Sequence, residues 1–200
     1  MARGSTYRVP SRRRREGKTD YQARKALVLS GTPRLVARST VKNVVAQIIV
    51  AKPHGDEVLA AAHSKELKKY GWKAPTGNVP AAYLTGLLCG LKAKAKGVAE
   101  AVLDIGLVAP TKGAKVFAAL SGVLDAGVEV PHDEEKLVKE RMEGAHIAEY
   151  GKSLSEDSEV YAAKFSKYLA QKLSPEQVPE HFAKVKAEII KSFEKGGKKA

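Results

Sequence analysis

The 200-residue sequence predicts an α/β protein in which helices pack on a mixed β-sheet. The first observation is an apolar segment at residues 78–97, in which Leu84, Leu87 and Leu88 start a run with the period of a helix that Leu91 completes. The second is that strand-like runs flank this segment, at Glu57–His63 and Ala101–Val108. A helix between two strands is a βαβ unit, around which the other elements can be placed.

The ends of this central helix carry the expected signals. Asn78 suits the N-cap, Pro80 the first turn and Gly97 the stop after the last turn. A second stripe of the helix has only small side chains: Ala82, Gly86, Cys89, Gly90 and Ala93. Because a helical glycine costs ~1 kcal/mol relative to alanine, we expect this stripe to pack closely, against the sheet.

The N-terminal residues precede any apolar pattern. Residues 1–18 contain the run Arg12–Arg15 and too few apolar side chains to form a core, so we expect an extended basic arm when the chain is free. Thr19 and Gln22 have the spacing of a capping box, which predicts a short helix at Asp20–Ser30.

Three strands follow and should form an antiparallel meander: Arg34–Ser39, Val44–Lys52 and Asp56–His63. In the first of them Arg34, Val36 and Arg38 share one face, and Leu35 and Ala37 the other.

The segment Ser64–Gly77 predicts a helical turn and a loop. Its Trp72 is either a core anchor or a platform for a base, and the anchor is the preferred interpretation.

After the central helix, Ala101–Val108 predicts a strand buried on both faces except at Asp104. Lys115–Ala126 predicts a second helix, and Val128–Val130 a short last strand. The predicted order of elements is three strands, a helix, a strand, a helix and a strand. The ribonuclease H-like arrangement has this order.

The composition changes after residue 130. Charged helical patterns occur at Glu134–Met142, Ser155–Leu173 and Pro179–Lys195, and Ser174 begins a clear start signal. The sequence therefore predicts three parts: an arm at 1–18, an α/β domain at 19–130 and a helical extension at 131–200.

Charge points to the class of partner. The chain has 35 basic and 22 acidic residues, a net charge of +13, and such proteins usually bind a polyanion. The first thirty residues hold nine basic and two acidic side chains, a net +7. The single cysteine, Cys89, excludes an internal disulfide and fits a reducing compartment. We find neither a signal peptide nor a membrane-spanning run, so we expect a cytoplasmic protein.

Enzyme motifs are missing from the sequence. It has no glycine-rich phosphate loop, and its five histidines lack the spacing of metal ligands. The alternative is a metal-dependent nuclease of ribonuclease H-like fold, which needs several converging carboxylates. Only Asp56, Asp104 and Asp125 remain for that role, and Asp104 is better interpreted as a paired structural charge. We therefore expect no catalysis, no cofactor, no metal and no small-molecule substrate.

The positive signal is a cationic surface for RNA. Arginine predominates in it, which suits bidentate phosphate contacts and stacking on bases. The predicted RNA-binding residues are Arg12, Arg13, Arg14, Arg15, Lys18, Tyr21, Arg24, Lys25, Arg34, Arg38 and Lys42.

Several motifs resemble those of one family. They are the arm with residues 19–25, the strand from Pro33 to Arg38, residues 46–49, residues 77–88 and residues 102–107. The chain is similar to the universal large-subunit ribosomal proteins that bind 5S ribosomal RNA, number eighteen in the bacterial scheme and number five in the eukaryotic one. The resemblance implies a structural role in the central protuberance of the ribosome. It also implies 5S RNA, large-subunit RNA and neighbouring ribosomal proteins as partners.

Residues 144–150, Gly-Ala-His-Ile-Ala-Glu-Tyr, resemble the archaeal form in particular. One departure lies after Arg38, where the family usually has a Ser-Asn-Lys turn and this chain has Ser39-Thr40-Val41-Lys42. The low Asn, Gln and Cys content beside abundant Lys and Glu favours a thermophilic source.

Overall fold

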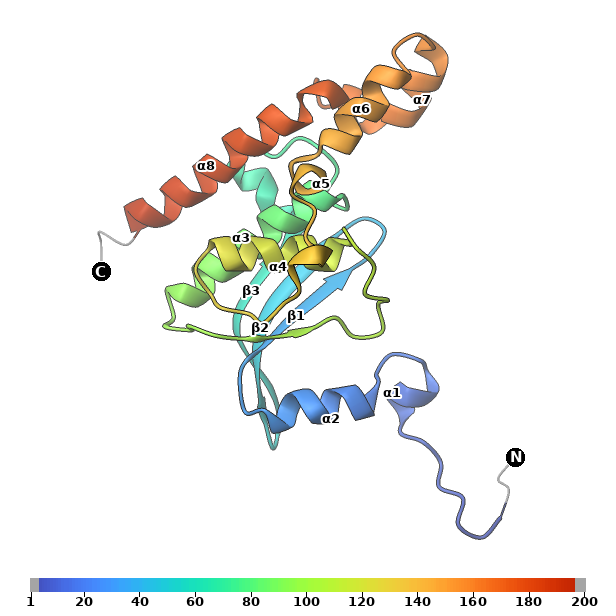
Figure 1. Cartoon of the computed structure of the whole chain (residues 1–200), viewed down its shortest axis with the longest axis vertical. Coiled ribbons are helices and arrows are strands. Elements are labelled where there is room, and N and C mark those ends of the chain that lie inside the picture. The colour runs from blue at the N-terminus through green and yellow to red at the C-terminus, as the bar shows by residue number, and fades with distance from the viewer. Residues whose placement is uncertain (1–3, 197–200) are drawn as a thin grey trace.

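The computed structural model describes residues 4–196 and contains a mixed four-stranded sheet (Figure 1). Its strands are β1 Arg34–Ser39, β2 Val44–Lys52, β3 Gly55–His63 and β4 Val102–Asp104. Their spatial order is β3-β2-β1-β4, with the first three strands antiparallel and β4 parallel to β1. The predicted α/β class and the meander are confirmed.

Two helices cover one face of this sheet. They are α3, Val79–Lys94, and α4, Lys115–Asp125. Leu35 and Ala37 of β1 have no exposed surface and belong to the same core cluster as these helices. Asn78 caps α3 as predicted, since its Oδ1 accepts a hydrogen bond of 2.9 Å from the Ala81 amide.

The small-residue stripe of α3 has a different partner from the one predicted. A Cβ atom on Gly86 would lie 1.9 Å from the backbone oxygen of Ala119, and one on Gly90 would lie 2.6 Å from the Cβ of Ala126. Both glycines therefore face α4 and not the sheet. Gly122 of α4 is the reciprocal contact, because its Cβ would lie 2.1 Å from the oxygen of Tyr83. Cys89 faces the sheet, with its sulfur 3.9 Å from the Ala60 oxygen.

The last two predicted strands are shorter than expected. β4 ends at Asp104, and Gly106 has a φ of 67°, so the chain turns there. The burial is also the reverse of the prediction, because Asp104 is buried while Val102 and Leu103 are half-buried. Of the predicted strand Val128–Val130, only an isolated parallel bridge from Glu129 to Glu100 is present.

The N-terminal region forms two helices, α1 at Arg12–Arg15 and α2 at Tyr21–Leu29. Figure 1 places them at the opposite end of the molecule from the C-terminal helices. The capping-box prediction was wrong in its residue: Asp20 caps α2 by accepting from the Gln22 and Ala23 amides at 2.9 and 3.2 Å.

The C-terminal part is helical. Its elements are η2 Glu134–Lys136, α5 Lys139–Glu143, α6 Ala145–Ser153, α7 Ser158–Leu169, η3 Pro175–Gln177 and α8 Val178–Gly196. The sequence analysis missed α6. Residues 1–3 of the predicted arm and 197–200 of the predicted extension lie outside the described residues.

Polar and aromatic contacts link α8 to the α/β core. Lys186 of α8 lies 3.0 Å from Asp125, which also accepts a hydrogen bond from the Tyr83 hydroxyl. Trp72, in the loop after η1 Ser64–Tyr70, is 3% exposed and stacks on His181 with ring centroids 5.2 Å apart. The prediction of a core anchor at Trp72 is confirmed.

Two lysines, one in α3 and one in the turn after it, cover the exposed edge of β3. Lys92 Nζ donates to the Ala61 carbonyl at 2.9 Å and pairs with Glu66 at 2.7 Å. Lys96 Nζ donates to the Leu59 carbonyl. Two outward-facing carbonyls of the edge strand are thus occupied by side chains of the same chain.

Candidate RNA interface

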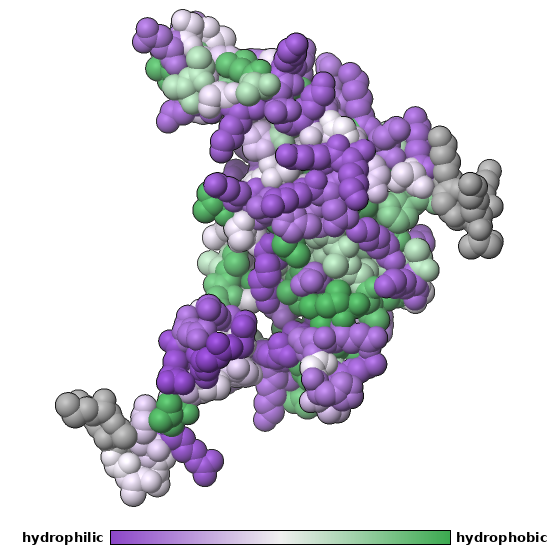
Figure 2. All heavy atoms as spheres, turned by 180° about the vertical axis from the view of Figure 1, so that it is seen from behind, coloured by the Kyte–Doolittle hydropathy of each residue, from purple (hydrophilic) through white to green (hydrophobic). Residues whose placement is uncertain are grey.

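The most basic element is α1, whose four residues Arg12–Arg15 are all exposed. Figure 2 shows strongly hydrophilic side chains gathered over this region, next to the N-terminal end. The turn is held by Glu16, which lies 3.7 Å from Arg12 and 2.9 Å from Lys18. An extended conformation was the prediction for these residues, and the structure corrects it: the pairing with Glu16 offsets part of the repulsion among the arginines.

Helix α2 is attached to the sheet through one guanidinium. Arg24 Nη2 donates to both carboxylate oxygens of Asp56, at 2.8 and 3.0 Å. Tyr21 and Lys25 of the same helix are exposed, with Tyr21 39% accessible. A further bond, from Arg13 Nε to Thr19 Oγ1 at 2.9 Å, ties α1 to the segment before α2.

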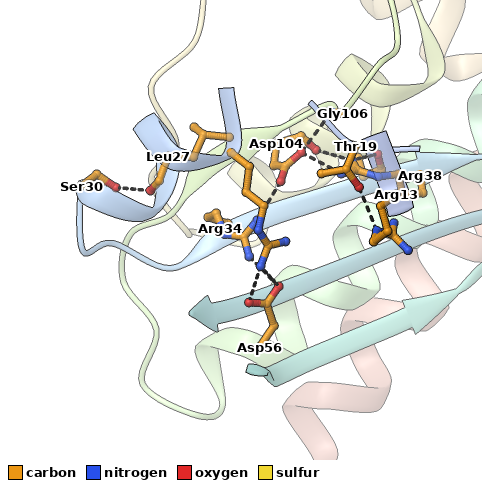
Figure 3. Close-up of polar contacts among 11 residues, drawn as sticks. Arg13, Thr19, Leu27, Ser30, Arg34, Arg38, Asp56, Asp104 and Gly106 are labelled. Carbon is orange, nitrogen blue, oxygen red and sulfur yellow. Dashed lines mark hydrogen bonds and ion pairs between the residues drawn. The ribbon is translucent and has the colours of Figure 1, made fainter. Parts of the chain in front are cut away.

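Arg34 is placed differently from the prediction. It is 2% exposed, and its guanidinium lies between two carboxylates (Figure 3). Arg34 Nη1 donates to Asp104 Oδ2 at 2.9 Å, and Nη2 donates to Asp56 Oδ2 at 2.8 Å. A guanidinium held in this way has no free surface for a phosphate, so Arg34 is a structural residue of the sheet.

Arg38 pairs with a residue of the sheet and is also partly exposed to solvent. Its Nη2 donates to Asp104 Oδ1 and its Nη1 to the Asp104 backbone oxygen, both at 2.7 Å, while its side chain is 44% exposed. The guanidinium packs over Gly106, where a Cβ atom would lie 2.9 Å from Arg38 Cζ. One edge of Arg38 is therefore fixed and the other is open to a ligand.

Asp104 is ionised in this environment. Burial alone would raise its pKa, but hydrogen bonds and charges from Arg38 and Arg34, with the Gly106 amide, hold the pKa below its ordinary value of 3.8. The network Arg24–Asp56–Arg34–Asp104–Arg38 then has three positive and two negative charges. It keeps a net charge of +1 under the open face of the sheet.

A small cleft of about 180 Å³ lies where α1, α2 and the segment after β4 meet. Four cationic residues line it: Arg13, Lys18, Arg24 and Arg38. We define the N-terminal cationic surface as the exposed cations of α1 and α2, the cations that line this cleft, and the exposed Tyr21 beside them. It comprises Arg12, Arg13, Arg14, Arg15, Lys18, Tyr21, Arg24, Lys25 and Arg38. Lys42, in the β1–β2 turn, does not line this cleft.

The three aspartates considered for a nuclease do not converge. Asp56 and Asp104 are each bound to arginines, and Asp125 is held by Tyr83 and Lys186 near α8. Within residues 4–196 no group of three His, Cys, Asp or Glu residues could hold a metal ion. Across the same residues, no helix is long and apolar enough to cross a membrane.

Sequence reasoning did not identify Asp56 as a partner of two arginines. The signal available was its position at the start of β3, but its pairing with Arg24 and Arg34 links residues 32 and 22 positions apart. No local pattern reports such a pairing.

Comparison with known families supports the resemblance found in the sequence. The family model for "ribosomal large subunit proteins 60S L5, and 50S L18" matches residues 5–100 and 90–133. The match spans both N-terminal helices, the whole sheet, α3 and α4. The chain thus belongs to this family of 5S ribosomal RNA-binding proteins of the large ribosomal subunit, whose role is structural and not enzymatic.

Proposed function

We propose that the N-terminal cationic surface is the part of this chain that binds 5S ribosomal RNA. The proposal also assigns the chain a role in attaching 5S RNA to large-subunit RNA in the central protuberance, beside neighbouring ribosomal proteins. Residues 144–150 support the archaeal form of the family. The proposal places the protein in the cytoplasm, within the ribosome.

One observation carries this proposal. Arg13, Arg14 and Arg15 of α1 are exposed and pair with no carboxylate among the described residues, whereas Arg34 is buried and pairs with two carboxylates. Phosphates can supply the missing counter-charge through bidentate contacts. Tyr21, on the adjacent helix, adds an aromatic face for an unstacked base.

A salt titration tests the proposal. If roughly six phosphates are neutralised, the logarithm of 5S RNA affinity should fall against the logarithm of salt concentration with a slope of about −4 to −5. Replacing Arg12–Arg15 by alanine should flatten this slope and weaken binding, with circular dichroism and thermal unfolding unchanged.

A matched control variant removes four positive charges from the C-terminal helices instead of from α1. Four exposed lysines of α7 and α8 are suitable: Lys164, Lys167, Lys184 and Lys191. Their replacement by alanine should leave most of the slope in place. An equal loss of slope in both variants would mean that net charge, and not this surface, governs the binding.

A further inference from the structure

A second cavity, of about 620 Å³, shares no lining residue with the cleft of the N-terminal cationic surface. One wall is formed by the end of β1 and the N-termini of α3 and α4, and the other by α5, α6 and α7. The cavity thus separates the α/β core from the C-terminal helices.

The charged groups of this cavity are cationic. Lys115, the first residue of α4, and Arg141 of α5 line it, and its lining includes no carboxylate among residues 4–196. Among residues 4–196, the Lys115 ammonium donates one hydrogen bond, to the Thr40 carbonyl at 3.2 Å, and forms no ion pair. Two cations without a carboxylate favour an anionic occupant.

The backbone adds positive potential at the same wall. Ala114 occupies the N-cap of α4 and offers no side-chain cap. The first amide of α4 that donates within the helix is that of Phe117, which donates to the Ala114 carbonyl at 3.1 Å. The amides of Lys115 and Val116 come before it and have no carbonyl partner within the helix. Both residues line the cavity.

The opposite wall is aromatic. Tyr150 of α6 is 48% exposed and lies in a tilted arrangement with buried Phe165, their centroids 5.9 Å apart. One face of the Tyr150 ring is therefore supported by the protein while much of the ring is open. Beside it, His146 Nδ1 is buried without a hydrogen-bond partner among the described residues.

We propose that this cavity holds one unstacked nucleotide of ribosomal RNA, with its base against Tyr150 and its phosphate beside Lys115 and Arg141. An apolar protein segment fits less well, because it would leave both cations without a counter-charge. The inference rests on the proposed function only in requiring that the chain meets ribosomal RNA.

The test uses the full-length chain with a fluorescein-labelled single-stranded RNA pentanucleotide of mixed sequence. Fluorescence anisotropy is measured in the Arg12–Arg15→Ala background, so that α1 does not contribute. Tyr150→Ala should weaken binding by roughly tenfold, the typical loss for one base–aromatic stack, and Arg141→Gln should weaken it several-fold. Tyr150→Phe and Arg141→Lys keep the ring and the charge and should bind nearly as well as their parent.

Ultraviolet crosslinking followed by mass spectrometry gives a second readout, in which the pentanucleotide should attach to the peptide that contains Tyr150. Thermal unfolding checks that the variants fold; Arg141→Gln, at an exposed position, carries the test if Tyr150→Ala does not. Equal binding by Tyr150→Ala and Tyr150→Phe, or no binding by the parent, would overturn the proposal. The proposal would also be overturned if a ribosomal protein bound over this cavity and the pentanucleotide did not bind.

The outcome is separable from that of the N-terminal cationic surface. With α1 intact, the cavity variants should keep the affinity and salt slope for isolated 5S RNA, which the α1 variants lose. Absence of pentanucleotide binding by the parent, with a normal salt slope for 5S RNA, therefore speaks against the cavity. An unchanged salt slope in the α1 variant, with pentanucleotide binding retained, speaks against the proposed function.

Discussion

Arg34 and Asp104 form an ion pair that joins β1 to β4 in the interior of the protein. The distance from Arg34 Nη1 to Asp104 Oδ2 is 2.9 Å, and the two side chains are 3% and 9% exposed. Through Asp56 the same arginine also connects to Arg24 of α2. The arrangement positions the N-terminal helices relative to the sheet, so an arginine in a strand of an RNA-binding protein serves the architecture of the interface.

Replacing Asp104 by asparagine should be strongly destabilising. It leaves the buried Arg34 with one carboxylate and Arg38 with none, and breaking a buried pair costs roughly 3–5 kcal/mol. Urea unfolding measures the loss. Glu57→Gln is the control, because Glu57 pairs with Lys52 where both side chains are about half exposed, and such pairs contribute at most about 1 kcal/mol. Equal effects of the two substitutions would contradict the structural role of Asp104.

Replacing Gly86 by alanine should destabilise the protein despite the better helix propensity of alanine. The propensity gain is ~1 kcal/mol, but the new methyl group would meet the Ala119 oxygen, and overpacking costs about 1–3 kcal/mol or more. Thermal unfolding of the variant measures the net effect. Ala119→Gly should not rescue it, because the contact is with a backbone atom. A rise in the unfolding midpoint would show that the two helices can separate at little cost.

Mild acid should loosen the contact between α8 and the core. His181 Nε2 accepts a hydrogen bond of 3.0 Å from the Lys73 amide, which a protonated ring cannot do. Burial, with the charges of Lys73 and Lys184, lowers the pKa of His181 below 6.5. The folded state thus binds a proton less readily than the unfolded state, and stability present above pH 6.5 is lost as the pH falls below it.

The loss should amount to at most about 1.4 kcal/mol per pH unit for this single group. Trp72 is the only tryptophan and stacks on His181, so its fluorescence should change over the same range. His181→Gln should remove that change in fluorescence. A fluorescence transition of the same size in His181→Gln would assign it to another group, of which His146 is the first candidate because its pKa is also lowered.

The segment before α2 should become ordered on RNA. A single helical turn such as α1 is too short to be stable alone, and fixing each backbone residue costs on the order of 1–2 kcal/mol. In the free chain we expect rapid amide exchange in residues 4–18 and trypsin cleavage at Arg12–Arg15. Saturating 5S RNA should slow both. Protected amides without RNA would mean that α1 folds stably against α2.

Local patterns predicted the regular elements well. The bounds of β1 and β2 were those of the alternation in the sequence, and Asn78 capped α3 as its position implied. The glycines of α3 were recognised as sites of close approach, but their partner was wrong. Periodicity shows which side of a helix is small, and only the tertiary arrangement decides whether α4 or the sheet lies there.

The candidate site was predicted only in part, for a similar reason. Alternation placed Arg34 and Arg38 on one face, which is correct. It could not show that Asp104, 70 residues after Arg34, would lie beside both. The same limit applies to Lys42, which is close to Arg38 in sequence but does not line the cleft that Arg38 lines. The cavity beside Tyr150 depends on α6, which the sequence analysis missed.

The lysines that lie along β3 restrict how this protein can associate before it meets RNA. An exposed edge strand is a template for pairing with another chain, but Lys92 and Lys96 already occupy the carbonyls of Ala61 and Leu59. A second copy would have to displace two ammonium groups and then bury their charge beside its own backbone. Newly made chains are thereby biased against edge-to-edge aggregation before they bind RNA.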